Sequence, residues 1–412
     1  MNARVLIIAH GHPDLQKGGA EVAARNLHRA LLAEGVESAL IARTDGPSHG
    51  GSAFSSRGGT GELFVHTGMQ DAFDFRARDP HMVGLEFGAL LRRYQPTVIH
   101  FQHYVHLGLE WLHVARRTCP DAKLVLTLHE YLALCYHGGQ MLKRPGLELC
   151  YRSDPDDCAR CYPERGGGPD FFLRREFIRS AFALIDQFVT PSAFLKQRYV
   201  EWGLDASRIE VLENVQMVRS ALPPRRLAPG ELRGRFAFFG QANAFKGLDL
   251  ALEAFLVLPN HVRQQVHFAL HAAHLDEQPT AFREKLGKLL HAARRVATMH
   301  GRYEPADLPR RMENTDWVLV PSIWWENSPM VIQEAFGHGR PVLCSDIGGM
   351  AEKVRHGVDG WHFPARDARA LASTIIHLVT QEGLWDKLQA GVETPLDPAE
   401  ITRRHLALYR RP

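Results

Sequence analysis

Residues 321–335 read PSIWWENSPMVIQEA and follow the short apolar run Trp317–Val320. That run is typical of a buried strand, and the residues that follow the loop have the composition of a helix. Proline suits the first turn of a helix because its missing N–H has no partner to lose there. The stretch therefore predicts a strand, a loop that carries Glu326, and a helix whose first turn includes Ser328, Pro329 and Met330.

The same alternation of short apolar runs and helical patterns extends along the whole chain. Near-continuous apolar strands separated by helices are typical of parallel sheets covered on both faces. The expected strands are residues 5–9, 39–42, 98–101, 124–128, 188–190, 209–212, 236–240, 266–270, 317–320 and 341–344. Because the βαβ series begins again near residue 236, we predict an α/β protein with two Rossmann-like, doubly wound domains that face each other across a cleft.

The boundary between the two domains is expected in the proline-rich stretch at residues 215–230. We assign residues 1–217 to the N-terminal domain and residues 218–395 to the C-terminal domain. Residues 45–61, rich in glycine and serine, are predicted to be a mobile loop near the mouth of the first domain.

The composition is that of an ordinary globular protein of 412 residues. Its net charge of +3 is too small to demand a nucleic-acid partner. Paired arginines are scattered along the chain, which favours solvated helix faces, with an anionic membrane surface as the alternative. The sequence shows no signal-peptide pattern and no run long enough to span a bilayer, so we expect a cytoplasmic protein, with peripheral contact at the inner face of the membrane left open.

Two turns of the N-terminal half lie where open α/β sheets bind ligands. Gly18 and Gly19 stand between the first strand and the first helix, where glycine lets backbone N–H groups approach an anion. A plain tight turn is the alternative. His129 follows a predicted strand and can hydrogen-bond a ligand hydroxyl or a developing charge, although a loop or capping histidine would occupy the same place.

The C-terminal half carries charged residues at two comparable turns. Lys246, beside Gly247, opens a helix and is well placed to neutralise a diphosphate, whereas a merely solvated lysine is disfavoured there by the helix dipole. Glu334 lies about two helical turns after Glu326, so both carboxylates can read hydroxyls at two ends of one extended ligand. Residues 345–352 (SDIGGMAE) form another glycine-rich turn that opens a helix.

Taken in order, GGAE (18–21), TLHE (127–130), FGQANAFKGL (239–248), residues 321–342 and SDIGGMAE resemble glycosyltransferase family four, the large retaining GT-B group. The resemblance covers nearly the whole chain. It implies catalytic roles for Lys246 on the donor diphosphate, Glu326 on the transferred sugar and His129 facing that sugar. The implied donor-binding residues are Gly18, Gly19, Gln241, Arg302, Tyr303, Asn327, Ser328, Pro329, Met330 and Glu334.

This family assignment predicts a hexosyltransferase that uses a UDP- or GDP-sugar and a glycan, lipid-linked or small-molecule acceptor. The expected mechanism is front-face substitution without a catalytic metal, and residues 396–412 are expected to cross back to the N-terminal, acceptor-side domain. Two positions depart from the family: Gln241 replaces an arginine that shares the diphosphate, and Glu130 replaces an aspartate. A non-catalytic nucleotide-sugar-binding relative and a sugar-nucleotide epimerase are the alternatives.

A cysteine-rich insertion is predicted at about residues 135–165. Its short CxxC pair is typical of zinc sites, and a structural Zn²⁺ is one interpretation. Reduced thiols, disulfides and an iron–sulfur centre remain alternatives. The four candidate ligands are Cys135, Cys150, Cys158 and Cys161. Cys119 and Cys344 are expected to be isolated core residues, and the spacing of His100, His103 and His106 matches known metal-ligand sets poorly.

Overall fold

The computed structural model describes residues 3–15, 18–46, 52–56, 58–216 and 221–411. The chain forms two compact units: an N-terminal unit of Met1–Met217 with Asp397–Pro412, and a C-terminal unit of Val218–Leu396. Residues 217–220, where the predicted boundary falls, lie outside the described residues.

The N-terminal unit is built on one eight-stranded sheet with the order β10-β9-β8-β7-β1-β2-β4-β3. Every neighbouring pair is parallel except β3 and β4. Its strands are β1 (Arg4–Ala9), β2 (Glu37–Thr44), β3 (Phe54–Ser56), β4 (Glu62–His66), β7 (Val98–Phe101), β8 (Lys123–Thr127), β9 (Gln187–Thr190) and β10 (Ile209–Val211). A separate two-stranded ribbon joins β5 (Met69–Asp71) to β6 (Arg76–Ala77).

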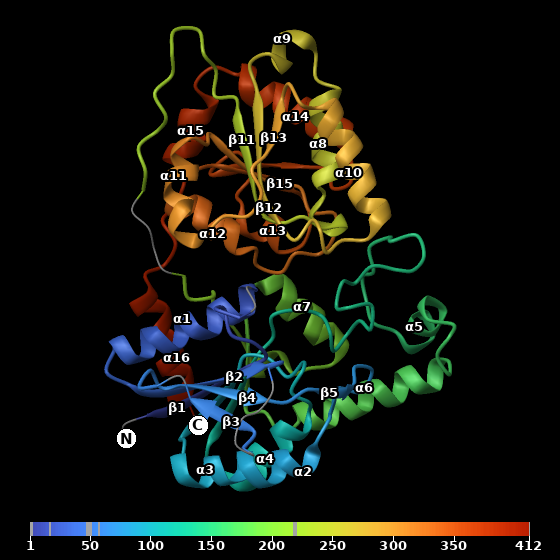
Figure 1. The fold of residues 1–412 in the computed structure, drawn as a ribbon, viewed down its shortest axis with the longest axis vertical. Helices are drawn as coiled ribbons and strands as arrows, with labels where there is room; N and C mark the ends of the chain where they lie inside the picture. The colour runs from blue at the N-terminus through green and yellow to red at the C-terminus, as the bar shows by residue number, and fades with distance from the viewer. Residues whose placement is uncertain (1–2, 16–17, 47–51, 57, 217–220, 412) are drawn as a thin grey trace. The chain divides into compact units, whose positions relative to one another are not determined.

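Helices cover both faces of this sheet. On one face, α1 (Gly19–Ala33) and the C-terminal helix α16 (Pro398–Arg410) share a hydrophobic core with β1, to which Ile401 and Leu408 contribute. Figure 1 shows α3 and α4 on the other side of the sheet from α1. The remaining elements are α2 (Pro80–Met82), a π-helical turn (Val83–Phe87), α3 (Gly88–Tyr94), α4 (Glu110–Thr118), α5 (Pro155–Cys161), α6 (Gly168–Phe182), α7 (Ala193–Trp202) and a 3₁₀ turn (Ala206–Arg208).

The C-terminal unit contains a six-stranded, fully parallel sheet with the order β13-β12-β11-β14-β15-β16. Its strands are β11 (Arg235–Gln241), β12 (His267–Ala273), β13 (Ala297–Met299), β14 (Trp317–Val320), β15 (Val342–Ser345) and β16 (Gly360–Phe363). Its helices are α8 (Leu248–Leu256), α9 (Asn260–Arg263), α10 (Thr280–Ala292), α11 (Leu308–Glu313), α12 (Met330–Gly337), α13 (Gly348–Lys353), α14 (Ala368–Thr380) and α15 (Leu384–Ala390). Two 3₁₀ turns precede α8 and α11, at Ala244–Lys246 and Pro305–Asp307.

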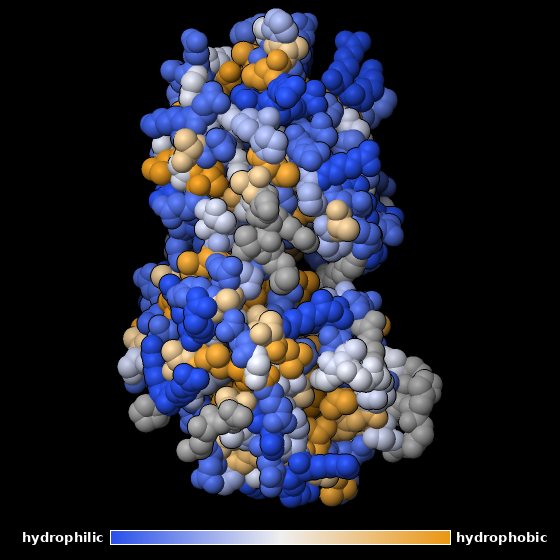
Figure 2. Space-filling model, turned by 90° about the vertical axis from the view of Figure 1, so that its left-hand side faces the viewer, coloured by the Kyte–Doolittle hydropathy of each residue, from blue (hydrophilic) through white to orange (hydrophobic). Residues whose placement is uncertain are grey.

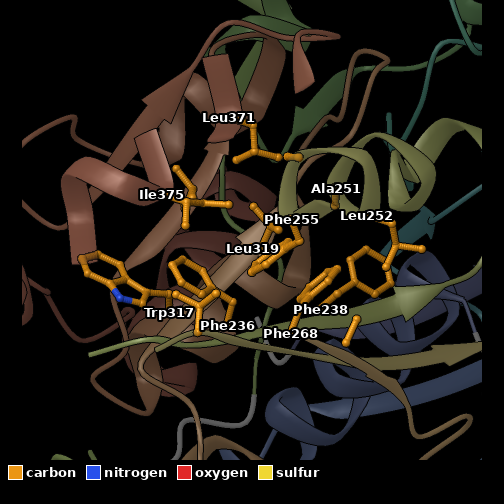
Figure 3. Close-up of a cluster of buried hydrophobic side chains, with 14 of the residues drawn as sticks. Phe236, Phe238, Ala251, Leu252, Phe255, Phe268, Trp317, Leu319, Leu371 and Ile375 are labelled. Carbon is orange, nitrogen blue, oxygen red and sulfur yellow. The ribbon is translucent and has the colours of Figure 1, made fainter. Parts of the chain in front are cut away.

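Two separate hydrophobic clusters hold this unit together, one on each face of the sheet. The larger joins the sheet to α8, α10 and α14, and the smaller joins it to α11, α12 and α13, as Figure 1 also shows for α8 and α12. In the larger cluster the rings of Phe255 and Phe268 stack with centroids 4.8 Å apart, and Trp317 lies beside Phe236 (Figure 3). A sheet with helices on both faces is the doubly wound arrangement, which confirms the predicted fold class in each unit.

The structure corrects two predictions about local structure. Part of the predicted loop at residues 45–61 is a strand, because Phe54–Ser56 pair antiparallel with β4; residues 47–51 and 57 of that loop lie outside the described residues. The helix expected to include Ser328 and Pro329 begins at Met330, with Pro329 as its N-cap residue.

Among the described residues, no helix is both long and apolar enough to cross a bilayer. On the face shown in Figure 2, hydrophobic residues appear in small groups among hydrophilic ones.

Candidate active site

In the sheet of the C-terminal unit, the direction in which successive strands are added reverses between β11 and β14. The candidate donor site lies at this point. Chain connections run from β11 outward to β12 and β13, and from β14 outward to β15 and β16. Loops that leave the carboxyl ends of two such strands diverge, and open α/β sheets bind ligands at this point. The loop after β11 carries Lys246, and the loop after β14 carries Glu326.

The structure brings Lys246 and Glu326 into direct contact. Lys246 Nζ donates to Glu326 Oε1 over 2.6 Å. The same oxygen accepts hydrogen bonds from Ser322 Oγ at 2.7 Å and Trp324 Nε1 at 2.9 Å. Burial opposes ionisation of Glu326, but Lys246 and these donors hold the pKa of its carboxyl below the usual value. The buried carboxylate of Glu326 is thus paired with one cation, the Lys246 ammonium, which is partly exposed to solvent.

Glycines fix the loops that position this pair. Gly247 adopts a positive φ of 69°, and a Cβ there would lie 2.0 Å from the carbonyl oxygen of Pro321. Gly349 donates its N–H to the carbonyl of Glu326 at 2.7 Å, and a Cβ on it would lie 1.6 Å from the oxygen of Asn327. Only residues without a side chain permit these approaches, so both turns hold the backbone on either side of Glu326.

The remaining predicted donor residues of the C-terminal unit lie at or after the carboxyl ends of β11, β13 and β14. Tyr303 and Glu334 interact electrostatically: burial first, and then the Glu334 charge, raise the pKa of the Tyr303 hydroxyl. Glu334 lies on α12, the helix that begins directly after residues 327–329. Arg302 and Gln241 are exposed. Gln241 is the last residue of β11 and is neutral, so Lys246 is the cation of the turn that follows this strand.

The N-terminal unit has its own switch point, between β1 and β7. His10 follows β1, Gln102 and His103 follow β7, and His129 comes shortly after β8. The rings of His10 and His103 lie with centroids 4.3 Å apart. His129 Nε2 lies 3.0 Å from Gln102 Oε1. Burial lowers the pKa of His129 to about 3, so its imidazole is neutral at physiological pH.

Two carboxylates pair with these histidines. Glu21 Oε1 lies 3.2 Å from His10 Nε2, and Glu130 Oε1 lies 3.4 Å from His103 Nε2. Burial opposes ionisation of Glu21, but the hydrogen bond with His10 holds its pKa below the usual value. Burial instead raises the pKa of Glu130 to about 8. The two carboxyl groups therefore differ in charge near neutral pH.

Glu21 changes the interpretation of the glycine-rich turn before α1. Gly18 is the N-cap residue of that helix, and a Cβ there would lie 2.3 Å from Glu21 Oε2. Gly19 is the first helical residue. The N-terminus of α1 thus already faces a carboxylate of its own chain, which an incoming phosphate would meet. Lys17, next to this turn, lies outside the described residues.

A buried hydrogen-bonded chain links α16 to His129. Tyr409 Oη lies 2.7 Å from His100 Nδ1, and His100 Nε2 lies 2.7 Å from Thr127 Oγ1. Gln102 Nε2 lies 3.2 Å from His100 Nε2, and its other amide atom contacts His129. His100 is therefore held by hydrogen bonds to its neighbours, and its role is structural. Sequence reasoning assigned no role to Gln102, His10, Ser322 or Trp324, although each directly follows a strand or stands in a quoted motif.

The four cysteines of the insertion line one pocket, and none of them forms a disulfide. Among the described residues, no three His, Cys, Asp or Glu side chains stand close enough together to hold a metal ion.

Both units of the chain match known glycosyltransferase families. Residues 17–215 match the family described as Glycosyltransferase Family 4, and residues 233–381 match Glycosyl transferases group 1. The amylovoran biosynthesis glycosyltransferase AmsK of Erwinia amylovora is 34% identical over 18% of this chain and 19% of its own length. A glycogen synthase of Mycobacterium tuberculosis is 23% identical over 90% of this chain and 85% of its own. The first of these alignments spans only about a fifth of the relative.

Solved structures share the fold along the entire chain. A sucrose-phosphate synthase from Thermosynechococcus elongatus matches with a TM-score of 0.72 and 16% identity, covering 99% of this chain and 98% of that one. Anabaena Alr3699/HepE in complex with UDP and glucose matches with a TM-score of 0.63 and 15% identity over 98% and 99% of the two chains.

The chain therefore belongs to the group 1, family 4 glycosyltransferases. This membership confirms the predicted family, the two-domain α/β fold, and the prediction that the chain is a glycosyltransferase enzyme.

Proposed function

We propose that the chain is a retaining hexosyltransferase that moves a sugar from a UDP- or GDP-linked donor to a glycan, lipid-linked or small-molecule acceptor. Transfer follows a front-face mechanism without a catalytic metal. Support for a nucleotide diphosphate donor comes from structural neighbours that were solved with UDP, UDP-glucose or ADP. Contact with a membrane surface stays a prediction.

One observation carries this proposal: the Lys246–Glu326 pair at the switch point of the C-terminal unit. A diphosphate attracts Lys246 more strongly than a single carboxylate does, because it offers more negative charge and more acceptor oxygens. When Lys246 moves to the diphosphate, Glu326 loses a partner and can accept hydrogen bonds from sugar hydroxyls. Donor binding thus replaces the Lys246–Glu326 ion pair by contacts of Lys246 with the diphosphate and of Glu326 with the sugar.

The remaining roles follow from position and charge. The loop before α12 and the first residue of that helix place the backbone of Ser328 and Met330 next to Glu326 and Asn327, while Pro329 has no N–H. Glu334 lies near Tyr303, which suits a ribose beside a nucleobase. Lys246 stabilises the charge that develops on the leaving diphosphate, which in turn takes the proton of the acceptor hydroxyl. His129, being neutral, acts as a hydrogen-bonding group rather than as a cation.

Donor binding is tested by thermal shift with UDP-, GDP-, ADP- and TDP-sugars. A ligand that binds the folded state raises its melting temperature in proportion to the logarithm of its concentration over Kd. We expect a shift with one nucleotide class, lost in Lys246→Ala and Glu334→Ala. The exposed residues Lys387 and Glu382 provide matched controls, and their alanine variants should keep the shift.

Catalysis is tested with the donor identified in this way. Labelled sugar should appear in product only with an acceptor present, and its anomeric configuration, read by NMR, should match that of the donor. Turnover should not depend on added Mg²⁺ or Mn²⁺. A donor shift without turnover on any acceptor would instead indicate a non-catalytic binding protein, and an epimerised donor without acceptor would indicate an epimerase.

A further inference from the structure

The insertion between β8 and α6 holds its shape with little regular structure. Residues 128–167 contain one short helix, α5, and one isolated β-bridge between Leu142 and Leu149. The segment follows directly after His129 and Glu130 of the candidate site. A bound metal can fix the backbone of such a segment, because the free energy of metal binding then contributes to folding.

The four cysteines of the insertion line one small pocket, but no three of them stand close enough together to hold an ion unless their side chains change rotamer. The residues that line it include Cys135, Cys150, Cys158 and Cys161. The space inside that can take the centre of a water-sized sphere is about 20 Å³. The pocket therefore has room for one ion.

Backbone groups of the insertion hydrogen-bond to the sulfur atoms, although burial raises the pKa of Cys135, Cys150 and Cys158, so a bound cation is needed to hold them as thiolates. An amide donor gains much more from a charged acceptor than from a neutral thiol. The Arg144 N–H lies 3.4 Å from Cys161 Sγ. The other contacts are those of the His137 and Met141 backbones with Cys135, the Arg152 backbone with Cys150, and the Asp154 backbone with Cys158. As a thiol, Cys150 also donates to the Arg152 carbonyl at 3.2 Å, a contact that it gives up on ionisation.

Positive charges lie where a thiolate cluster would need them. Four thiolates around a divalent ion carry a net charge of −2, which must be balanced when the cluster is buried. The guanidinium of Arg174 is buried, interacts electrostatically with Cys135 and Cys158, and directs three hydrogen bonds to backbone carbonyls. Lys143 lines the pocket and interacts with Cys150.

We propose that Cys135, Cys150, Cys158 and Cys161 bind one Zn²⁺ as thiolates, and that this ion fixes the loop that follows His129 and Glu130. The four thiols release their protons to solvent, and the sulfur side chains turn into the pocket to reach the ion. Zinc suits the site because it favours four sulfur ligands in a closed, tetrahedral structural site. This inference does not rest on the proposed sugar transfer.

Metal content of the full chain provides the first test. The protein is produced without a histidine tag, dialysed, and analysed for zinc and iron by mass spectrometry. We expect stoichiometric zinc that is lost in Cys158→Ser/Cys161→Ser and kept in Cys119→Ser, which removes a cysteine outside the pocket. X-ray absorption should show four sulfurs at about 2.3 Å from the ion.

A second measurement keeps the proposal testable if the double variant fails to fold. Replacing zinc by Co²⁺ in the natural chain should give the visible bands of a tetrahedral ion and a thiolate-to-cobalt charge-transfer band. The proposal is overturned by a natural chain that takes up neither zinc nor cobalt after incubation with either ion. Iron with sulfide, or a mass lowered by disulfide formation in freshly reduced and dialysed protein, would also overturn it.

Discussion

Replacement of Lys246 by methionine separates the stabilising role of the Lys246–Glu326 pair from its role in donor binding. In the variant, Glu326 keeps the hydrogen bonds from Ser322 and Trp324 but loses its counter-ion. Removal of one partner from a buried ion pair costs about 3–5 kcal/mol. The Lys246 side chain is 25% exposed and Glu326 can take up a proton, so we expect a smaller loss of about 2 kcal/mol at pH 8.

The loss should depend on pH with a definite sign. In the natural chain the pKa of Glu326 lies below its usual value, so its stabilising contribution is present above the unfolded-state pKa and disappears as pH falls through the folded-state pKa. Without Lys246, burial raises the pKa of this carboxyl instead, and protonation relieves the cost in acid. For a unit of this size, we expect a Tm lower by about 4–8 °C at pH 8, with the gap shrinking towards pH 5.

Calorimetry of four chains measures this effect: the natural protein, Lys246→Met, Lys246→Met/Glu326→Gln and the exposed control Lys387→Ala. The double variant should regain most of the lost stability, because a neutral amide needs no counter-ion, but it should not regain a donor-induced shift. An unchanged Tm for the single variant at pH 8 would refute the account of the buried carboxylate. A donor shift that returns in the double variant would refute the role of Lys246 in binding the diphosphate.

Other variants test other parts of the two sites. In Gly349→Ala, the new Cβ meets the carbonyl of Asn327, so the C-terminal unit should lose about 1–3 kcal/mol and the donor-induced thermal shift should vanish. Gln241→Arg adds a second cation near the diphosphate and should lower the donor Kd by about two- to fivefold in a titration at low salt. Glu130 has a raised pKa of about 8, so the unfolding free energy of the N-terminal unit should fall as pH rises from about 5 to 8, and denaturation of Glu130→Gln should show a flatter pH profile. Gln102→Leu should keep the donor-induced shift yet slow transfer by roughly ten- to hundredfold, because the histidine it contacts loses its orientation.

The fold was largely predictable because buried parallel strands are apolar on both faces. Each expected strand overlaps a strand of the structure, and Trp317–Val320 agrees in both bounds. Three of the strands that were missed, Phe54–Ser56, Ala297–Met299 and Gly360–Phe363, lie at sheet edges, whereas Glu62–His66 lies between β2 and β3. Phe54–Ser56 and Gly360–Phe363 are short, and they contain serine, or glycine and histidine, so they do not form a continuous apolar run.

The candidate site was predictable in its charged residues but not in their pairing. Motif spacing identified Lys246 and Glu326, which are 80 positions apart in the chain. Their contact arises because β11 and β14 are neighbours in the sheet. A local sequence pattern predicts a strand but does not predict which strands will be neighbours. The partners Ser322 and Trp324 are likewise selected by the loop that Gly247 and Gly349 hold in place.

The return of the C-terminal helix to the N-terminal unit has a chemical consequence for His129. A neutral imidazole has one donor and one acceptor nitrogen. His129 Nε2 meets the oxygen of the Gln102 amide, so Nε2 carries the proton and Nδ1 is the acceptor. Gln102 is held in this orientation by His100, which is fixed by Tyr409 of α16. Through this chain of hydrogen bonds, α16 sets which nitrogen of His129 donates and which accepts.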